Sequence, residues 1–170
     1  SRVIFTLTLT LALLDGSGAT ENDSIETLKD VGKKVVRVVD QNRNACVALV
    51  DGLGSGSGVI VSEDGLVLTA GHVIENTNLR NFEIVLSSGR RVKAKPLGHN
   101  LNNDLGMAQI LEPGPWPHAK IGRRNEIKRG DWVVSIGHSG GWELGRDAPV
   151  RTGRFLKLEN SQLVTDAVLI

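Results

Sequence analysis

The feature that most limits the fold of this chain is a succession of short apolar runs, each ended by turn-forming residues. The chain has 170 residues, 40% of them hydrophobic, with 20 glycines, three phenylalanines, three tryptophans and no tyrosine. This composition is typical of one turn-rich β domain. No long amphipathic helix and no solenoid repeat is expected, so an all-β barrel architecture is predicted. The predicted strands are 35–39, 45–50, 59–62, 66–69, 82–86, 91–94, 105–111, 131–136, 150–158 and 163–164.

The run Gly54-Ser55-Gly56-Ser57-Gly58 has the composition of a flexible linker. Apolar strands frame it closely on both sides, however, and it is too short to separate two domains. Further on, Glu63-Asp64-Gly65 has the residues of a hairpin turn between strands 59–62 and 66–69. A histidine at position 72 then lies just past a strand end, where a short loop presents it to a cleft.

The first 19 residues have the pattern of a secretory signal peptide. Arg2 precedes an apolar run from 3 to 14, and small residues at 17–19 offer a cleavage site. The run is too short to cross a bilayer as a helix, so no integral membrane segment is expected. The alternative interpretation is a buried β-strand, because threonines at 6, 8 and 10 alternate with apolar neighbours.

The domain organisation follows from these patterns. After the signal peptide we expect a linker and a short helix over 20–34, then a first β-barrel over 35–112. Prolines at 113, 115 and 117 mark the boundary, and a partial second β-barrel is expected over 118–170. The net charge of +1 does not point to nucleic acid or an anionic membrane as partner. A single cysteine, Cys46, excludes a disulfide within the chain.

Two motifs supply candidate catalytic residues. His72 lies in Thr69-Ala70-Gly71-His72-Val73, and Asp104 opens Asp104-Leu105-Gly106-Met107-Ala108 after an asparagine. Acyl transfer needs a base that accepts a hydroxyl proton and a carboxylate that fixes its tautomer. The alternatives are an ordinary histidine at a strand end and an aspartate that serves only in a turn.

This set of motifs resembles the trypsin-like serine peptidases, and within them the bacterial HtrA or Deg type. The matching segments are 54–61, 64–73, 103–108, 133–137 and 163–167. Animal trypsins usually have cysteine directly after the catalytic histidine. The valine at position 73 favours the disulfide-free bacterial branch.

The resemblance implies a double β-barrel, with the first barrel complete and the second incomplete. It implies that His72 is the general base and that Asp104 orients it. The nucleophilic serine, in a Gly-Asp-Ser-Gly-Gly setting, is then expected beyond Ile170, so the chain as given is expected to be inactive. The implied function is a serine endopeptidase, secreted or periplasmic, that acts on polypeptides without a cofactor or metal. The alternative is a non-catalytic protease homologue that binds proteins in the cleft between its barrels.

Ser139 imitates a nucleophile, because Gly137-His138-Ser139-Gly140-Gly141 fits the Gly-x-Ser-x-Gly elbow of α/β-hydrolases. Those enzymes place their histidine after the serine, and none follows here. The following segment is also a poor helix, and a trypsin-type site would have an acidic residue before the serine. A glycine-rich turn is the favoured interpretation, with an α/β-hydrolase as a third alternative. His99, His118 and His138 show no metal-ligand spacing.

Overall fold

The computed structural model describes residues 3–6, 9–13, 25–51, 54–75, 82–138, 141–159 and 162–167. Two α-helices, two 3₁₀ helices and eleven strands lie in these residues. None of the described helices is long and apolar enough to cross a membrane. The elements are β1 (Val3–Thr6), β2 (Leu9–Leu13), α1 (Ile25–Asn42), η1 (Arg43–Ala45), β3 (Cys46–Val50), β4 (Ser55–Ile60), β5 (Leu66–Ala70), α2 (Gly71–Glu75), β6 (Glu83–Val85), β7 (Arg91–Asn100), β8 (Leu105–Ile110), η2 (Arg124–Glu126), β9 (Trp132–Ile136), β10 (Val150–Glu159) and β11 (Gln162–Thr165).

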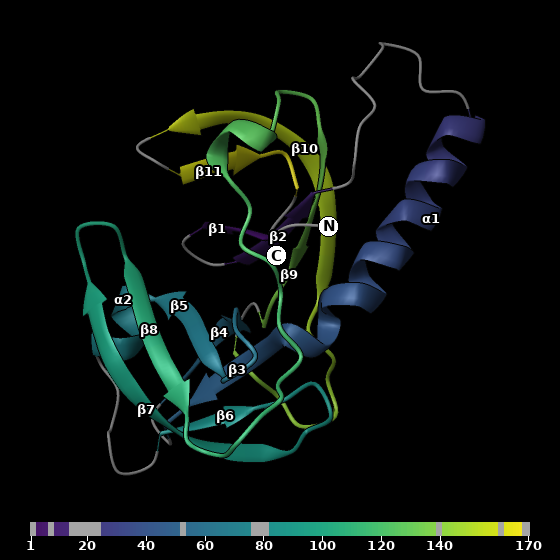
Figure 1. The fold of residues 1–170 in the computed structure, drawn as a ribbon. Helices are drawn as coiled ribbons and strands as arrows, with labels where there is room; N and C mark the ends of the chain where they lie inside the picture. Colours follow the sequence, from purple (N-terminus) through teal and green to yellow (C-terminus); the bar gives the residue numbers. More distant parts are fainter. Residues whose placement is uncertain are drawn as a thin grey trace.

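The first barrel is closed, with strand order β3-β4-β5-β8-β7-β6 and β6 returning to β3. It occupies the lower part of Figure 1. Every pairing is antiparallel, and closure leaves no strand edge unpaired. The inward residues form one continuous apolar core. Its buried members are Val47, Leu49, Ile60, Val67, Ile74, Phe82, Ile84, Val92, Ala94, Ala108, Ile110 and Trp116.

The second sheet has five strands in the order β1-β2-β9-β10-β11 and lies above the barrel in Figure 1. Its described strands do not close into a barrel. The all-β class is therefore confirmed, with a complete first barrel and an incomplete second one. The backbone of the predicted signal segment forms β1 and β2, and β2 pairs with β9. This pairing matches the strand alternative, whereas the signal peptide stays a prediction.

The strand predicted over 35–39 is wrong, because helix α1 continues through it to Asn42. The expectation that the chain has no long amphipathic helix is also wrong. Counted from Val31, further valines follow after four, seven and eight residues, at Val35, Val38 and Val39. This spacing places all four valines on one helix face. This face packs against Val134 and Ile136 of β9. The β-branched valines favour a strand, but packing of this stripe outweighs that preference. The first barrel accordingly begins near Cys46 and not at residue 35.

The proline-containing segment between β8 and η2 runs along the first barrel. The Trp116 ring is buried in the barrel core, and its backbone N–H donates to the carbonyl of Glu63 at 2.9 Å. Farther on, the N–H of Ala119 donates to the carbonyl of Ile60, also at 2.9 Å. The segment therefore covers the outside of the β4–β5 hairpin before the chain enters β9.

Candidate active site

His72 lies on α2, the short helix that follows β5 directly. The helix begins at Gly71, where a Cβ atom would lie 3.1 Å from the backbone nitrogen of Leu105 and 3.2 Å from the carbonyl oxygen of Asn100. Glycine therefore lets the start of α2 lie tightly against the β7–β8 connection. On the same helix Ile74 is buried in the barrel core. These contacts fix the helix and leave the His72 side chain 55% exposed.

Asp104 ends the tight connection from β7 to β8. Its φ angle is 46°, in the left-handed region that aspartate tolerates better than most residues. The Asn100 side-chain oxygen accepts hydrogen bonds from the backbone N–H groups of Asn102, at 3.0 Å, and Asn103, at 3.4 Å. The N–H of Asp104 donates to the carbonyl of Leu101 at 3.2 Å. Asp104 therefore serves in the turn and also contacts His72, so the two interpretations of this residue do not exclude each other.

The His72 ring and the Asp104 carboxylate form a close pair. The imidazole Nδ1 lies 2.9 Å from Oδ2 and 3.0 Å from Oδ1 of Asp104. The backbone N–H of His72 also donates to Oδ1, at 2.9 Å. The carboxylate, only 16% exposed, therefore holds both the ring and the main chain of the histidine. A carboxylate that accepts from Nδ1–H selects the tautomer in which Nε2 is the basic nitrogen.

The glycines of β4 make room for neighbouring side chains, Gly56 on the side of helix α2 and Gly58 on the side of β3 and β5. A Cβ on Gly56 would lie 2.6 Å from Cγ2 of Val73, and one on Gly58 would lie 2.5 Å from Cδ1 of Leu49. The hydroxyl of Thr69 donates to the carbonyl of Ser57 at 2.7 Å and ties β5 to β4. The rejection of a flexible linker is confirmed, because the glycine-rich run forms a strand that supports the residue next to His72.

The other candidates lie apart from this pair or outside the described residues. Ser139 lies outside them. His118 has its Nδ1 at 3.1 Å from the carbonyl oxygen of Trp116, on the segment between the barrels. Within the described ranges no group of three or more histidine, cysteine or acidic side chains is placed to hold a metal ion. Sequence reasoning missed Asn100, whose signal was the cluster of turn-forming asparagines that follows it.

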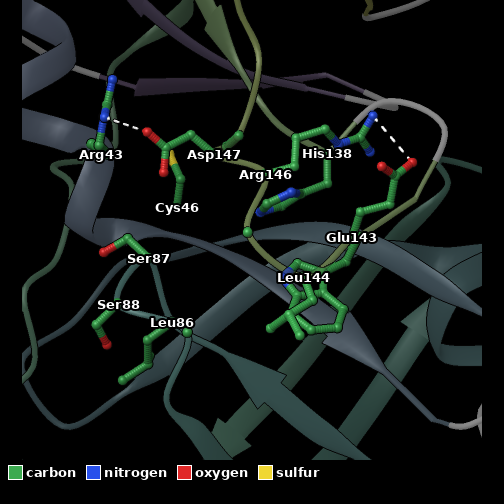
Figure 2. Close-up of a pocket in the computed structure, with 14 residues that line it drawn as sticks. Arg43, Cys46, Leu86, Ser87, Ser88, His138, Glu143, Leu144, Arg146 and Asp147 are labelled. Carbon is green, nitrogen blue, oxygen red and sulfur yellow. Dashed lines mark hydrogen bonds and ion pairs between the residues drawn. The ribbon is translucent and has the colours of Figure 1, made fainter.

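A pocket of about 280 Å³ lies where the loop after β9 meets the first barrel (Figure 2). His138 lines it, and burial, followed by the nearby Arg146 guanidinium, lowers the pKa of this imidazole below its ordinary value, against a smaller opposing effect of Asp147. Arg43 forms an ion pair with Asp147 at 3.0 Å across the pocket rim. Neither His72 nor Asp104 lines this pocket, so it is separate from the His72–Asp104 pair.

A histidine held by a partly buried carboxylate, on two connections between strands of a closed antiparallel barrel, is the arrangement of a trypsin-type peptidase. The trypsin-like peptidase domain family matches residues 56–167, and the chain belongs to this family. It is 36% identical to mouse "Serine protease HTRA4" over 68% of this chain and 25% of the mouse protein. It is 33% identical to Xenopus laevis "Serine protease HTRA1" over 68% of this chain and 26% of that protein.

A bacterial relative shows the same extent of similarity. The chain is 33% identical to "Probable periplasmic serine endoprotease DegP-like" of Hahella chejuensis over 65% of this chain and 23% of the relative. The chain thus spans about a quarter of the length of these curated relatives. The likeness to HtrA and Deg-type proteases is therefore confirmed for this domain.

Proposed function

We propose that this domain provides the general base and its orienting carboxylate for a serine endopeptidase of the HtrA type. The observation that carries the proposal is the hydrogen bond of His72 Nδ1 to the Asp104 carboxylate at 2.9 Å. The nucleophilic serine is proposed to come from the segment that follows Ile170, in a Gly-Asp-Ser-Gly-Gly setting within about ten residues.

In the proposed reaction, Nε2 of His72 takes the proton of the serine hydroxyl while the serine oxygen attacks the carbonyl carbon of the peptide bond. The C–N bond then breaks, and the same proton passes from Nε2 to the leaving amine. Asp104 keeps its negative charge throughout and stabilises the imidazolium that forms between these steps. Water repeats the sequence to release the acyl group. Every proton is carried by His72, so no metal or cofactor is needed.

We further propose polypeptide substrates and a secreted or periplasmic location. The names of the relatives support both, since one is a serine endoprotease called periplasmic and others are serine proteases. Export by a signal peptide over residues 1–19 belongs to the same proposal. N-terminal sequencing of the exported protein tests it, because an N-terminus that still contains Arg2 would contradict cleavage.

Labelling with a serine-directed fluorophosphonate tests the function in a chain extended through its natural C-terminus. The extended chain is expected to label, and His72→Ala is expected to abolish labelling because the serine loses its base. Ser139→Ala is the matched control and is expected to label like the unchanged protein. If Ser139→Ala abolishes labelling while His72→Ala does not, an α/β-hydrolase replaces the proposal. A folded extended chain that does not label would favour the non-catalytic binding module.

A further inference from the structure

Two serine hydroxyls on β4 join the first barrel to a loop of the second sheet. Ser55 and Ser57 are two residues apart, so their side chains lie on the same side of the strand. The Ser57 hydroxyl oxygen accepts a hydrogen bond from the backbone N–H of His138 at 2.8 Å. The Ser55 hydroxyl oxygen accepts one from the backbone N–H of Trp142, also at 2.8 Å. Both donors belong to the loop between β9 and β10.

The indole of Trp142 strengthens this junction. It packs against a small buried cluster of the first barrel that consists of Ala48, Val50 and Val85. The guanidinium of Arg91, on β7, lies 5.0 Å from the centroid of the ring, within the range of a cation–π interaction. The loop is therefore anchored on the first barrel by two hydrogen bonds and one aromatic side chain. We call Ser55, Ser57 and Trp142 the loop anchor.

The glycine between the two serines connects the loop anchor to the catalytic helix. Gly56 approaches Val73, the residue after His72, so closely that a Cβ atom would lie 2.6 Å from Cγ2 of that valine. The serines on either side of it contact the loop of the second sheet. One short strand segment thus touches both the helix that carries the histidine and the loop that enters β10. Any shift of this loop relative to β4 is also a shift relative to His72.

We propose that Ser55 and Ser57 are positioning residues, whose hydroxyls set the register between the His72–Asp104 barrel and the second sheet. The inference rests on the proposed function, in which the nucleophile follows β11 of the second sheet and must meet a histidine on the first barrel. Reaction rates depend steeply on such alignment, and a misplacement of about 1 Å costs about a hundredfold. The serines act through the loop and do not touch the substrate.

Ser57→Ala tests the proposal with two measurements. In the 170-residue chain, hydrogen exchange of the backbone amide of His138 is expected to quicken about fivefold, which corresponds to one lost hydrogen bond. In the extended enzyme, kcat on a chromogenic peptide is expected to fall about fivefold while KM stays within about twofold. Ser57→Thr keeps the hydroxyl and is expected to restore both values. The double variant Ser55→Ala/Ser57→Ala is expected to quicken amide exchange in the loop more than Ser57→Ala does. It is also expected to lower kcat more than the single variant.

Ser87→Ala is the matched control, because Ser87 lines the pocket beside the loop but its hydroxyl donates to the Asn44 side chain at 2.9 Å. It is expected to change neither the amide exchange of the loop nor kcat. The proposal is overturned if Ser57→Ala leaves either value unchanged, or if Ser87→Ala has the same effects. If the extended chain shows no peptidase activity at all, the proposed function fails, and the exchange measurement still decides whether the serines hold the loop.

Discussion

The first barrel and the second sheet are both antiparallel, but only the first closes on itself within the described residues. Closure gives the barrel one continuous core. The second sheet instead divides its apolar residues between a cluster beneath α1 and a separate cluster around Phe155. The difference shows that the two residues whose relative position matters most lie on the closed barrel and not on the open sheet. His72 and Asp104 both lie on connections of the closed barrel, whose strands are paired along both edges.

The two regions also differ in how they depend on distant parts of the chain. Most barrel strands pair with near neighbours in sequence, as β4 does with β5 and β7 with β8. Before any cleavage of the proposed signal peptide, the second sheet also pairs β2 with β9, more than a hundred residues later. Contacts between such distant segments cost more loop-closure entropy. We therefore expect the barrel to hold His72 and Asp104 together even when the second sheet opens.

The largest expected effect comes from removing the negative charge of the Asp104 carboxylate next to His72. Asp104→Asn keeps the shape of the side chain and an oxygen that accepts from the backbone N–H of His72, and asparagine tolerates the φ of 46°. It removes the charge that stabilises the imidazolium and selects its tautomer. We expect kcat of the extended enzyme to fall by about 10³- to 10⁴-fold, with an unchanged circular dichroism spectrum. A loss below tenfold would contradict the role of Asp104.

The second prediction tests whether the barrel stays folded when the second sheet opens. Ile84 is buried in the barrel core, and Ile136 is buried between the second sheet and α1. Truncation of either to alanine is expected to cost about 3 kcal/mol of unfolding free energy, because each leaves a cavity. Ile136→Ala is expected to quicken amide exchange in β9 and β10 while β5 stays protected. Ile84→Ala is expected to quicken exchange in both regions.

Equal acceleration of both regions by both variants would contradict this expectation. The domain would then open as a single cooperative unit. Native-state hydrogen exchange read out by mass spectrometry separates the two outcomes, because β5 and β9 lie far apart in the sequence.

Local patterns were sufficient to predict most of the barrel strands and to single out His72 and Asp104, which the structure brings into contact. The alternation of apolar residues and the turn signals predicted the β4–β5 hairpin, and the motifs placed His72 and Asp104 on neighbouring connections. The anchoring of the loop at Trp142 was not predictable, because it depends on contacts between segments more than eighty residues apart. The pairing of β2 with β9 is of the same kind. Periodicity carries no information about such distant partners.

The error over 35–39 has a different cause. Four valines in five residues favour a strand by local preference. The correct signal was the longer helical period that begins at Val31, and it is visible only over two turns or more. A five-residue window therefore favours the strand, whereas the packing of α1 on β9 selects the helix.

The third effect separates these two interpretations with a pair of valines. A strand places Val36 and Val38 on the same face, whereas a helix places them on nearly opposite faces. In α1 Val38 is 5% exposed and Val36 is 60% exposed. Val38→Ala is expected to lower the unfolding free energy by about 2 kcal/mol, measured by urea denaturation. Val36→Ala is expected to change it by less than about 0.5 kcal/mol. Equal losses would argue against the helix.

The smallest effect lies at the junction of the two regions, where His138 lines the pocket beneath the loop. Burial, followed by Arg146, lowers the pKa of His138 in the folded protein, while the unfolded chain keeps the ordinary value of 6.5. As the pH falls below 6.5 the unfolded state takes up a proton that the folded state refuses, so stability declines until the lowered folded pKa is reached. His138→Gln is expected to remove this part of the decline in urea midpoints between pH 7.5 and 5.5. His99→Gln, at an exposed position on β7, is the control, and an equal change from both substitutions would contradict the assignment.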